Sequence, residues 1–282
     1  MKIFKMTLED GHIIRGLLSE AENKDILIIH FHGFGGDCYA NHFLQIMHEQ
    51  FPANGISFLS VNTRYSGYLV ENYSENSVSY LGASVCDYRN IEYDVNAIVD
   101  FFDSKYDYCV LQGHSFGTNL VKLYLRKHNC NRLSIFLSPA DSVGLYNEWK
   151  KRQNVDIDIQ KTNVRNGYLV RTDNFGMLTD YGEYQIPITD IALSELLISE
   201  IFHEWSLPLK KICNPSLVIK GSNDMISNYG TTKTNESMYM LLPNSEVFSI
   251  NTAKHIFENF ENELFRTIVN WLFKETKNRT NN

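Results

Sequence analysis

The sequence predicts an α/β fold in which a mostly parallel central sheet is flanked by helices and interrupted by a mainly helical insertion. Apolar runs typical of buried strands alternate with helical patterns over residues 25–138, an order that favours parallel strands. The apolar run at 108–111 leads into Gly-His-Ser-Phe-Gly at 113–117, and another helical pattern follows. The alternation stops at Pro139 and resumes at Ser216, which indicates the insertion.

Composition limits the classes of function to consider. The 282 residues are 43% hydrophobic and 21% charged, as in ordinary soluble globular proteins. The net charge of −7 argues against nucleic acids and anionic membranes as partners. No apolar stretch reaches the roughly 18 residues of a membrane span, and residues 1–10 lack the apolar core of a signal peptide. The five cysteines are scattered and form no Cys-x-x-Cys pair, so we expect a cytoplasmic protein without disulfides or a zinc site.

The first half of the chain predicts most of the sheet. Residues 2–8 and 12–19 indicate two strands joined in a hairpin at Asp10–Gly11. Residues 25–31 are nearly continuously apolar, as in a strand covered on both faces, and lead into a glycine-rich loop. The other predicted elements are a helix at 39–51, a strand at 56–61, an irregular excursion at 63–88, a helix at 91–104 and a strand at 132–138. We expect the excursion to supply an active-site loop, because it follows the carboxyl end of a strand.

The second half begins with the segment that lacks sheet rhythm. Residues 139–209 are too many for a connecting loop and include Trp149 and Trp205, so they predict a mostly helical cap, with room for a short hairpin. The core of the fold is then residues 1–138 and 210–282. Its remaining elements are strands at 216–220 and 246–250, a helix near 231–242 and a final helix at about 257–274.

The pentapeptide at 113–117 predicts the nucleophile. Strand, sharp turn and helix form the context in which Gly-x-Ser-x-Gly lifts a serine hydroxyl above a sheet. Such a turn forces an unfavourable backbone conformation on Ser115, and glycine at 113 and 117 avoids collisions with the neighbouring strand and helix. The helix that begins there aims backbone N–H groups at a reacting oxygen.

Four pieces of the chain together resemble the α/β-hydrolase superfamily. They are His-Gly-Phe-Gly at 32–35, the pentapeptide, Gly-Ser-Asn-Asp at 221–224, and His255. The likeness covers about 1–140 and 210–277, and it is loosely closest to capped esterases of the feruloyl-esterase or siderophore-esterase type. It implies serine-dependent hydrolysis of esters, or sometimes of amides or thioesters, without a metal or organic cofactor. Such relatives often carry Gly after the arginine that matches Arg64; here Tyr65 follows, so we expect a reshaped loop.

The family's chain order of serine, acid and histidine narrows the choice of general base. Only three histidines follow Ser115. His128 lies about three and a half helical turns away, and His203 lies in the predicted cap. His255 follows the last strand at the carboxyl edge of the sheet, so we predict that it is the base.

The orienting acid should follow an earlier strand at the same edge. Asp224 comes a short turn after the apolar run at 217–220, and we predict that it fixes the tautomer of His255. Asp141 follows the strand at 132–138 and is the rival, although a role in a turn or helix cap suits it better.

Two backbone N–H groups are needed to stabilise an oxyanion. We predict that Phe116, directly after the nucleophile, supplies one. Phe34, in the glycine-rich loop, supplies the other. His32 is predicted to stabilise that loop rather than to contact substrate.

These expectations favour hydrolysis of a small-molecule carboxylic ester through an acyl-enzyme. A thioesterase or acyltransferase acting on a carrier-bound chain would use the same three residues. A ligand-binding receptor with slow turnover is the alternative from another class. The sequence names neither the acyl and alcohol groups nor the oligomeric state.

Overall fold

The fold is built on one eight-stranded sheet with the strand order β1-β2-β4-β3-β7-β8-β13-β14. The computed structural model describes residues 1–23, 25–73, 78–128, 132–153, 164–165, 168–169, 176–180, 182–204, 212–228 and 242–280. The strands of the sheet are β1 (Lys2–Thr7), β2 (Ile13–Ser19), β3 (Ile26–Phe31), β4 (Ile56–Asn62), β7 (Tyr108–His114), β8 (Ser134–Leu137), β13 (Ser216–Gly221) and β14 (Ser245–Ile250). Every strand expected in the sheet is therefore present, with bounds that differ by a few residues.

Strand direction follows the hydrophobic pattern. Within this sheet, neighbouring strands pair in parallel along the series β4, β3, β7, β8, β13 and β14. β1 and β2 pair antiparallel to each other, and β2 pairs antiparallel to β4. β3 is buried along its whole length, as its continuous apolar run predicts. Its neighbours are β4 on one side and β7 on the other, so the loops that follow β3 and β7 meet at the carboxyl edge. After β3 the chain adds β4 on one side and later β7 on the other, so the order of strands reverses at β3. Open α/β sheets bind ligands at such a reversal.

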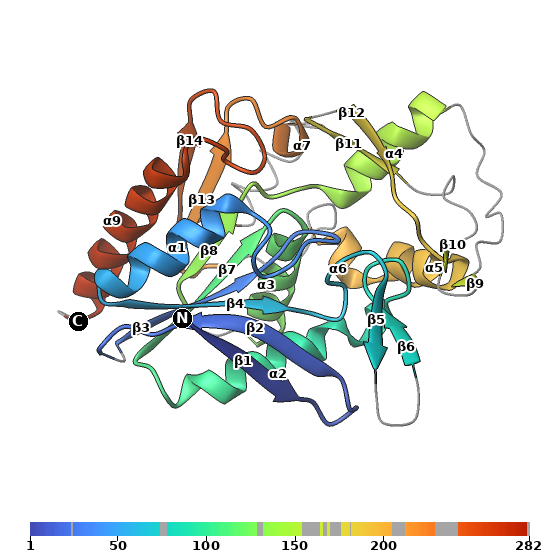
Figure 1. Cartoon of the computed structure of the whole chain (residues 1–282). Coiled ribbons are helices and arrows are strands. Elements are labelled where there is room, and N and C mark those ends of the chain that lie inside the picture. Colours follow the sequence, from blue (N-terminus) through green and yellow to red (C-terminus); the bar gives the residue numbers. More distant parts are fainter. Residues whose placement is uncertain are drawn as a thin grey trace.

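Helices cover both faces of the sheet, and alternate residues of each strand serve the two cores (Figure 1). Leu27 and Ile29 pack with α2 (Ile91–Asp103) and α3 (Phe116–His128). Ile28, from the same strand, packs with α1 (His42–Ala53) and α9 (Glu261–Thr280). The apolar side chains that recur every three to four positions along α2 are all buried, as expected for its inner face: Ile91, Val95, Ile98 and Phe102.

The insertion lies between the end of β8 and the start of β13. In Figure 1 it gathers on the side of the molecule away from α1 and α9. Its described elements are α4 (Ser142–Gln153), β9 (Val164–Arg165), β10 (Tyr168–Leu169), β11 (Gly176–Thr179), β12 (Gly182–Gln185), α5 (Asp190–Ile198) and α6 (Glu200–His203). β11 and β12 form a hairpin, as do β9 and β10. The expected fold class, a mostly parallel central sheet flanked by helices, is confirmed.

The excursion at 63–88 is more regular than its sequence indicates. It contains the antiparallel hairpin of β5 (Val70–Tyr73) and β6 (Val78–Leu81), followed by the short helix η1 (Tyr88–Asn90). Gly67 and Gly82 adopt positive φ angles of 66° and 109° at the base of the hairpin. There the N–H of Gly67 donates to Gly36 and the N–H of Ala83 donates to Gly67, which fastens the excursion to the glycine-rich loop.

Two helices begin later than their patterns predict. Asp37 accepts hydrogen bonds from the N–H groups of Tyr39 and Ala40, and this local turn delays α1 until His42. Phe257 and Asn259 have φ angles of 55° and 69°, which are incompatible with a right-handed helix, so α9 begins at Glu261.

The short helix α7 (Met225–Asn228) follows β13, and the helix expected near 231–242 falls mostly on 229–241, outside the described residues. In the described part of the chain, no helix is both long and apolar enough to cross a bilayer.

Candidate active site

Ser115 occupies the turn between β7 and α3 in a strained conformation. Its φ angle is 53°, in the left-handed region that residues with a Cβ rarely adopt. Its N–H continues the sheet by donating to the carbonyl of Leu137, and its carbonyl accepts from the N–H and hydroxyl of Thr118. The backbone is thus fixed on both sides of the side chain, which is the elbow that the pentapeptide predicts.

The two glycines of the elbow are required by close backbone contacts. A Cβ at Gly113 would overlap the carbonyl of Gly117, and one at Gly117 would overlap the carbonyls of Phe31 and His32. Larger residues would therefore push α3 away from the ends of β3 and β7. The predicted reason for these glycines matches the packing.

Asp224 and His255 form a buried hydrogen-bonded pair. His255 Nδ1 lies 3.0 Å from Asp224 Oδ1 and 3.1 Å from Oδ2. Asp224 lies just beyond β13 and His255 just beyond β14, which are adjacent parallel strands. A carboxylate only accepts, so the neutral imidazole carries its proton on Nδ1 and keeps Nε2 as the acceptor.

The environment of Asp224 keeps it ionised. Burial alone would raise its pKa, but the neighbouring His255 and the hydrogen bonds to the carboxylate outweigh burial and hold the pKa well below the usual 3.8. One of those bonds comes from the N–H of Ser227, at 2.9 Å, so Asp224 also caps the first turn of α7. The carboxylate serves as a local cap and as the partner of a histidine.

His114 connects the elbow to the loop that carries His255. Its Nε2 lies 2.9 Å from the backbone oxygen of His255 and donates to it, and the two rings are 4.9 Å apart. Burial, reinforced by the nearby His255, lowers the pKa of His114 to about 3, so this ring is neutral. The residue before Ser115 therefore contacts the residue predicted to be its base. Sequence reasoning missed His114, because the position before the serine accepts many residue types in the motif.

The competing residues are engaged elsewhere. The carboxylate of Asp141 accepts from the N–H of Gly144 at 3.0 Å, at the start of α4, as expected for a turn or cap. His128 is exposed at the end of α3 and bonds to Asn96. His203 bonds to the carbonyl of Leu197 within the insertion.

The two residues predicted to form an oxyanion hole are neighbours. The rings of Phe34 and Phe116 pack edge to face with centroids 5.4 Å apart. Gly33, which precedes Phe34, faces Ser115 so closely that a Cβ there would lie 3.1 Å from the Cβ of the serine. Phe116 is the first residue of α3, where N–H groups have no acceptor within the helix. Both backbones therefore lie beside the serine.

His32 stabilises the glycine-rich loop, as expected. Its Nδ1 donates to the carbonyl of Gly33 at 2.7 Å, and its Nε2 accepts from the hydroxyls of Ser66, at 2.6 Å, and Thr63, at 3.2 Å. Burial lowers its pKa to about 4, which keeps Nε2 available as an acceptor. Tyr65 is buried against the ring of His32 and donates to the carbonyl of His32. Tyr65 therefore fastens the loop that follows β4 to the glycine-rich loop.

Solved structures show what the chain is similar to. No known family model matches the sequence, and no curated protein matches it. The ferulic acid complex of Est1E from Butyrivibrio proteoclasticus superposes with a TM-score of 0.66 at 14% identity, covering 95% of this chain and 97% of that one. The chain has the α/β-hydrolase fold. The esterase Pf2001 from Pyrococcus furiosus (TM-score 0.59, 15% identity, 97% and 89% covered) and mouse alpha/beta hydrolase domain-containing protein 10 (0.62, 14%, 97% and 99%) share this fold.

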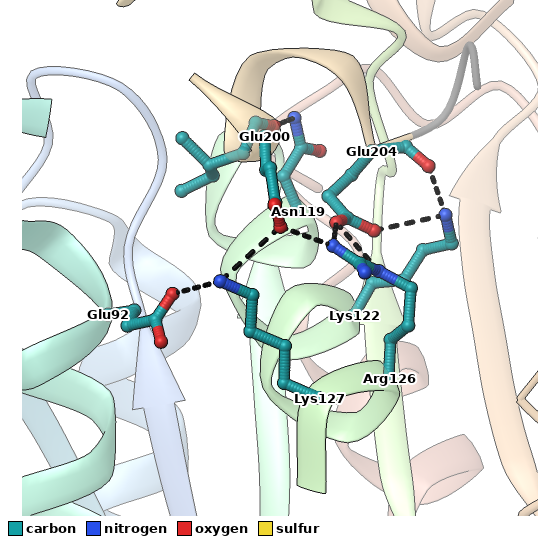
Figure 2. A network of polar contacts seen from close by, with 8 residues as sticks. Glu92, Asn119, Lys122, Arg126, Lys127, Glu200 and Glu204 are labelled. Carbon is teal, nitrogen blue, oxygen red and sulfur yellow. Dashed lines mark hydrogen bonds and ion pairs between the residues drawn. The ribbon is translucent and has the colours of Figure 1, made fainter. Parts of the chain in front are cut away.

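The insertion into this α/β-hydrolase fold is fastened to α3, the helix that follows Ser115 (Figure 2). The ammonium of Lys122 on α3 is fully buried, donates to the backbone oxygen of Glu204 and lies 3.3 Å from its carboxylate. Arg126, one turn further along, pairs with Glu204 at 2.9 Å and with Glu200 at 2.7 Å. Burial lowers the pKa of Lys122 to about 8, although Glu204 opposes that shift. We call Lys122, Arg126, Glu200 and Glu204 the α3 anchor.

Among the residues that the structure describes, no group of three or more His, Cys, Asp or Glu side chains is placed to hold a metal ion.

Proposed function

We propose that the protein is a serine hydrolase that cleaves a small-molecule carboxylic ester through an acyl-enzyme. The buried pair of Asp224 and His255 carries this proposal, because it lies at the same sheet edge as the strained Ser115. Est1E and Pf2001, which share the fold, are described as a ferulic-acid-binding protein and an esterase, respectively. That similarity supports hydrolase chemistry without identifying the substrate.

The proposed reaction assigns one role to each group. His255 Nε2 removes the proton of the Ser115 hydroxyl as its oxygen attacks the ester carbonyl. The N–H groups of Phe34 and Phe116 stabilise the oxyanion that forms, and Asp224 stabilises the imidazolium. His255 then gives the proton to the departing alcohol. A water molecule repeats the sequence on the acyl-enzyme, which releases the acid and restores Ser115.

We further propose that the insertion is a cap that selects the substrate, and that the enzyme works in the cytoplasm. The insertion contacts α7 beside Asp224, so it lies next to the reacting groups. The cysteines Cys38, Cys86 and Cys109 are free and buried, as suits a reducing compartment. A thioesterase would use the same groups, and parallel assays with oxygen and thioester substrates of one acyl chain distinguish the two activities.

A covalent probe tests the nucleophile directly. A fluorophosphonate should label the wild-type protein at Ser115, identified by mass spectrometry of the digested protein, and Ser115→Ala should not be labelled. The same substitution should lower kcat on a p-nitrophenyl acyl series by about 10⁴-fold or more, because the covalent route is lost. His255→Ala should be nearly as damaging, since the residues act as a unit. Labelling of a different residue would refute the assignment, and labelling with negligible turnover would favour the receptor alternative.

A further inference from the structure

The turn of the β11–β12 hairpin reaches both loops that carry the acid–base pair. Asp180 lies in this turn, between Thr179 and the start of β12 at Gly182. Its Oδ1 accepts from the N–H of Met225 at 2.7 Å, and its Oδ2 accepts from the N–H of His255 at 2.7 Å. One carboxylate of the insertion therefore joins two loops of the core. Figure 1 shows the hairpin beside α7.

The two N–H groups that donate to Asp180 belong to the Asp224–His255 pair or directly adjoin it. Met225 directly follows Asp224, and His255 is the proposed base itself. On the sheet side, the same loops are joined by the N–H of Asn223, which donates to Ala253 at 3.0 Å, and the N–H of Thr252, which donates to Ser222 Oγ at 2.8 Å. Asp180 supplies the connection on the side of the insertion.

The backbone of His255 is thus held at both of its polar groups. His114 donates to its carbonyl at 2.9 Å, and Asp180 accepts from its N–H at 2.7 Å. Hydrogen bonds with a charged acceptor are shorter and about twice as strong as neutral ones. Displacement of a reacting group by about 1 Å can cost about 100-fold in rate. A loss of the contact to Asp180 would free the backbone of the loop that carries His255.

We propose that Asp180 is a positioning residue that couples docking of the insertion to alignment of the Asp224–His255 pair. This inference rests on the proposed function, because alignment has a kinetic consequence only if His255 is a base. Asp180 does not touch the reacting atoms. Its carboxylate acts through the backbone of His255 and the start of α7. In the part of the chain that the structure describes, titratable groups that contact His255 include the carboxylates of Asp224 and Asp180 and the neutral ring of His114.

Three substitutions at one position test the coupling. Asp180→Ala removes both contacts and should lower kcat by about 10- to 100-fold, with KM changed less than about 3-fold. Asp180→Asn keeps one carbonyl acceptor and should fall between Asp180→Ala and wild type. Asp180→Glu keeps the carboxylate and should recover part of the lost kcat.

Glu200→Ala is the matched control within the same insertion. Glu200 belongs to the α3 anchor, but its side chain is exposed and Arg126 keeps its pair with Glu204, so its loss should leave the insertion docked and the loops of Asp224 and His255 untouched. This variant should keep kcat within about 2-fold of wild type. Circular dichroism and thermal unfolding should show that all the variants are folded. The proposal is wrong if Asp180→Ala retains wild-type kcat, or if Glu200→Ala lowers kcat as much as Asp180→Ala does.

A spectroscopic readout separates this proposal from the proposed function. The Nδ1 proton between His255 and Asp224 should give a low-field proton resonance, assigned by its absence in His255→Gln. Asp180→Ala should broaden that resonance or speed its exchange with water, whether or not the protein hydrolyses any ester tested. An unchanged resonance would overturn the positioning role. A lost resonance in a protein that fluorophosphonate does not label would retain the coupling and reject the serine hydrolase.

Discussion

In the proposed mechanism, Ser115 and Asp224 each serve the backbone and the reaction together. The positive φ of Ser115 would be costly in isolation, and the hydrogen bonds from Ser115 to Leu137 and from Thr118 to Ser115 hold the residue there. Asp224 caps α7 through Ser227 while its carboxylate contacts His255. A cap and an orienting acid use the same oxygen atoms, so finding one role does not exclude the other.

At this scale the acid can be tested against its rival. In Asp224→Asn, the amide nitrogen can donate to Nδ1 of His255 and so force the proton onto Nε2, the wrong tautomer for a base. We expect kcat to fall by about three to four orders of magnitude, with a much smaller effect on KM. Asp141→Asn should be mild, because an asparagine oxygen still accepts from Gly144. Steady-state kinetics on the best p-nitrophenyl ester measures both variants, and the reverse ranking would place the acid after β8.

At the scale of elements, the insertion is continuous with the core. Residues of α5 and α6, such as Leu196, Ile201 and Phe202, belong to the same buried cluster as Leu120 and Tyr124 of α3. Replacing 139–209 by a short linker should change the preference among acyl chains, but it would also expose this shared surface. Point substitutions in the α3 anchor are therefore the cleaner test of how the insertion is held.

The α3 anchor contains a buried ion pair, and a more exposed ion pair lies beside it on α3. Glu204→Ala should lower the free energy of unfolding by about 3 kcal/mol, because it leaves Lys122 buried without its carboxylate. Glu92→Ala removes an exposed pair with Lys127, shown in Figure 2, and should cost less than about 1 kcal/mol. Urea unfolding at pH 7 measures both variants. Equal losses would mean that burial does not set the strength of the anchor.

For the whole molecule, buried neutral histidines make stability depend on pH. Burial lowers the pKa of His32 and His48 to about 4 and that of His114 to about 3, all below the ordinary 6.5. Between pH 6.5 and 4 the unfolded chain therefore binds protons that the folded chain does not. Their contribution to stability is complete above pH 6.5 and is lost as the pH falls, by up to ~1.4 kcal/mol per pH unit for each histidine.

His48 is the residue for testing this linkage, because it lies away from Ser115. Its ring bonds to the hydroxyls of Ser19 and Ser60 between β2, β4 and α1. In His48→Gln, the loss of unfolding free energy between pH 6.5 and 5 should be smaller than in wild type by up to about 2 kcal/mol. His128→Gln, at an exposed position, should leave the loss unchanged. Equal pH dependence in wild type and His48→Gln would show that His48 binds protons equally in the folded and the unfolded protein, which would contradict the linkage.

The sequence alone determined the sheet, the elbow and the order of the candidate residues. Continuous apolar runs mark strands buried on two faces, and glycine at 113 and 117 marks close backbone contacts. Both features depend on short stretches of the chain, so they can be predicted from the sequence. Because the carboxyl ends of parallel strands share an edge, the sequence also predicts that Asp224 and His255 lie close together. The adjacency of β13 and β14 then brings the two side chains together.

Only the tertiary structure decided which residues far apart in the chain touch. His114 reaches the carbonyl of His255 across 141 positions, and Asp180 reaches its N–H across 75, and no local pattern encodes either contact. The hairpin in 63–88 and the start of α9 were also set by contacts and backbone angles beyond the reach of periodicity. Hydrophobic pattern reports which face is buried, whereas the partner of a polar atom depends on how separate elements pack.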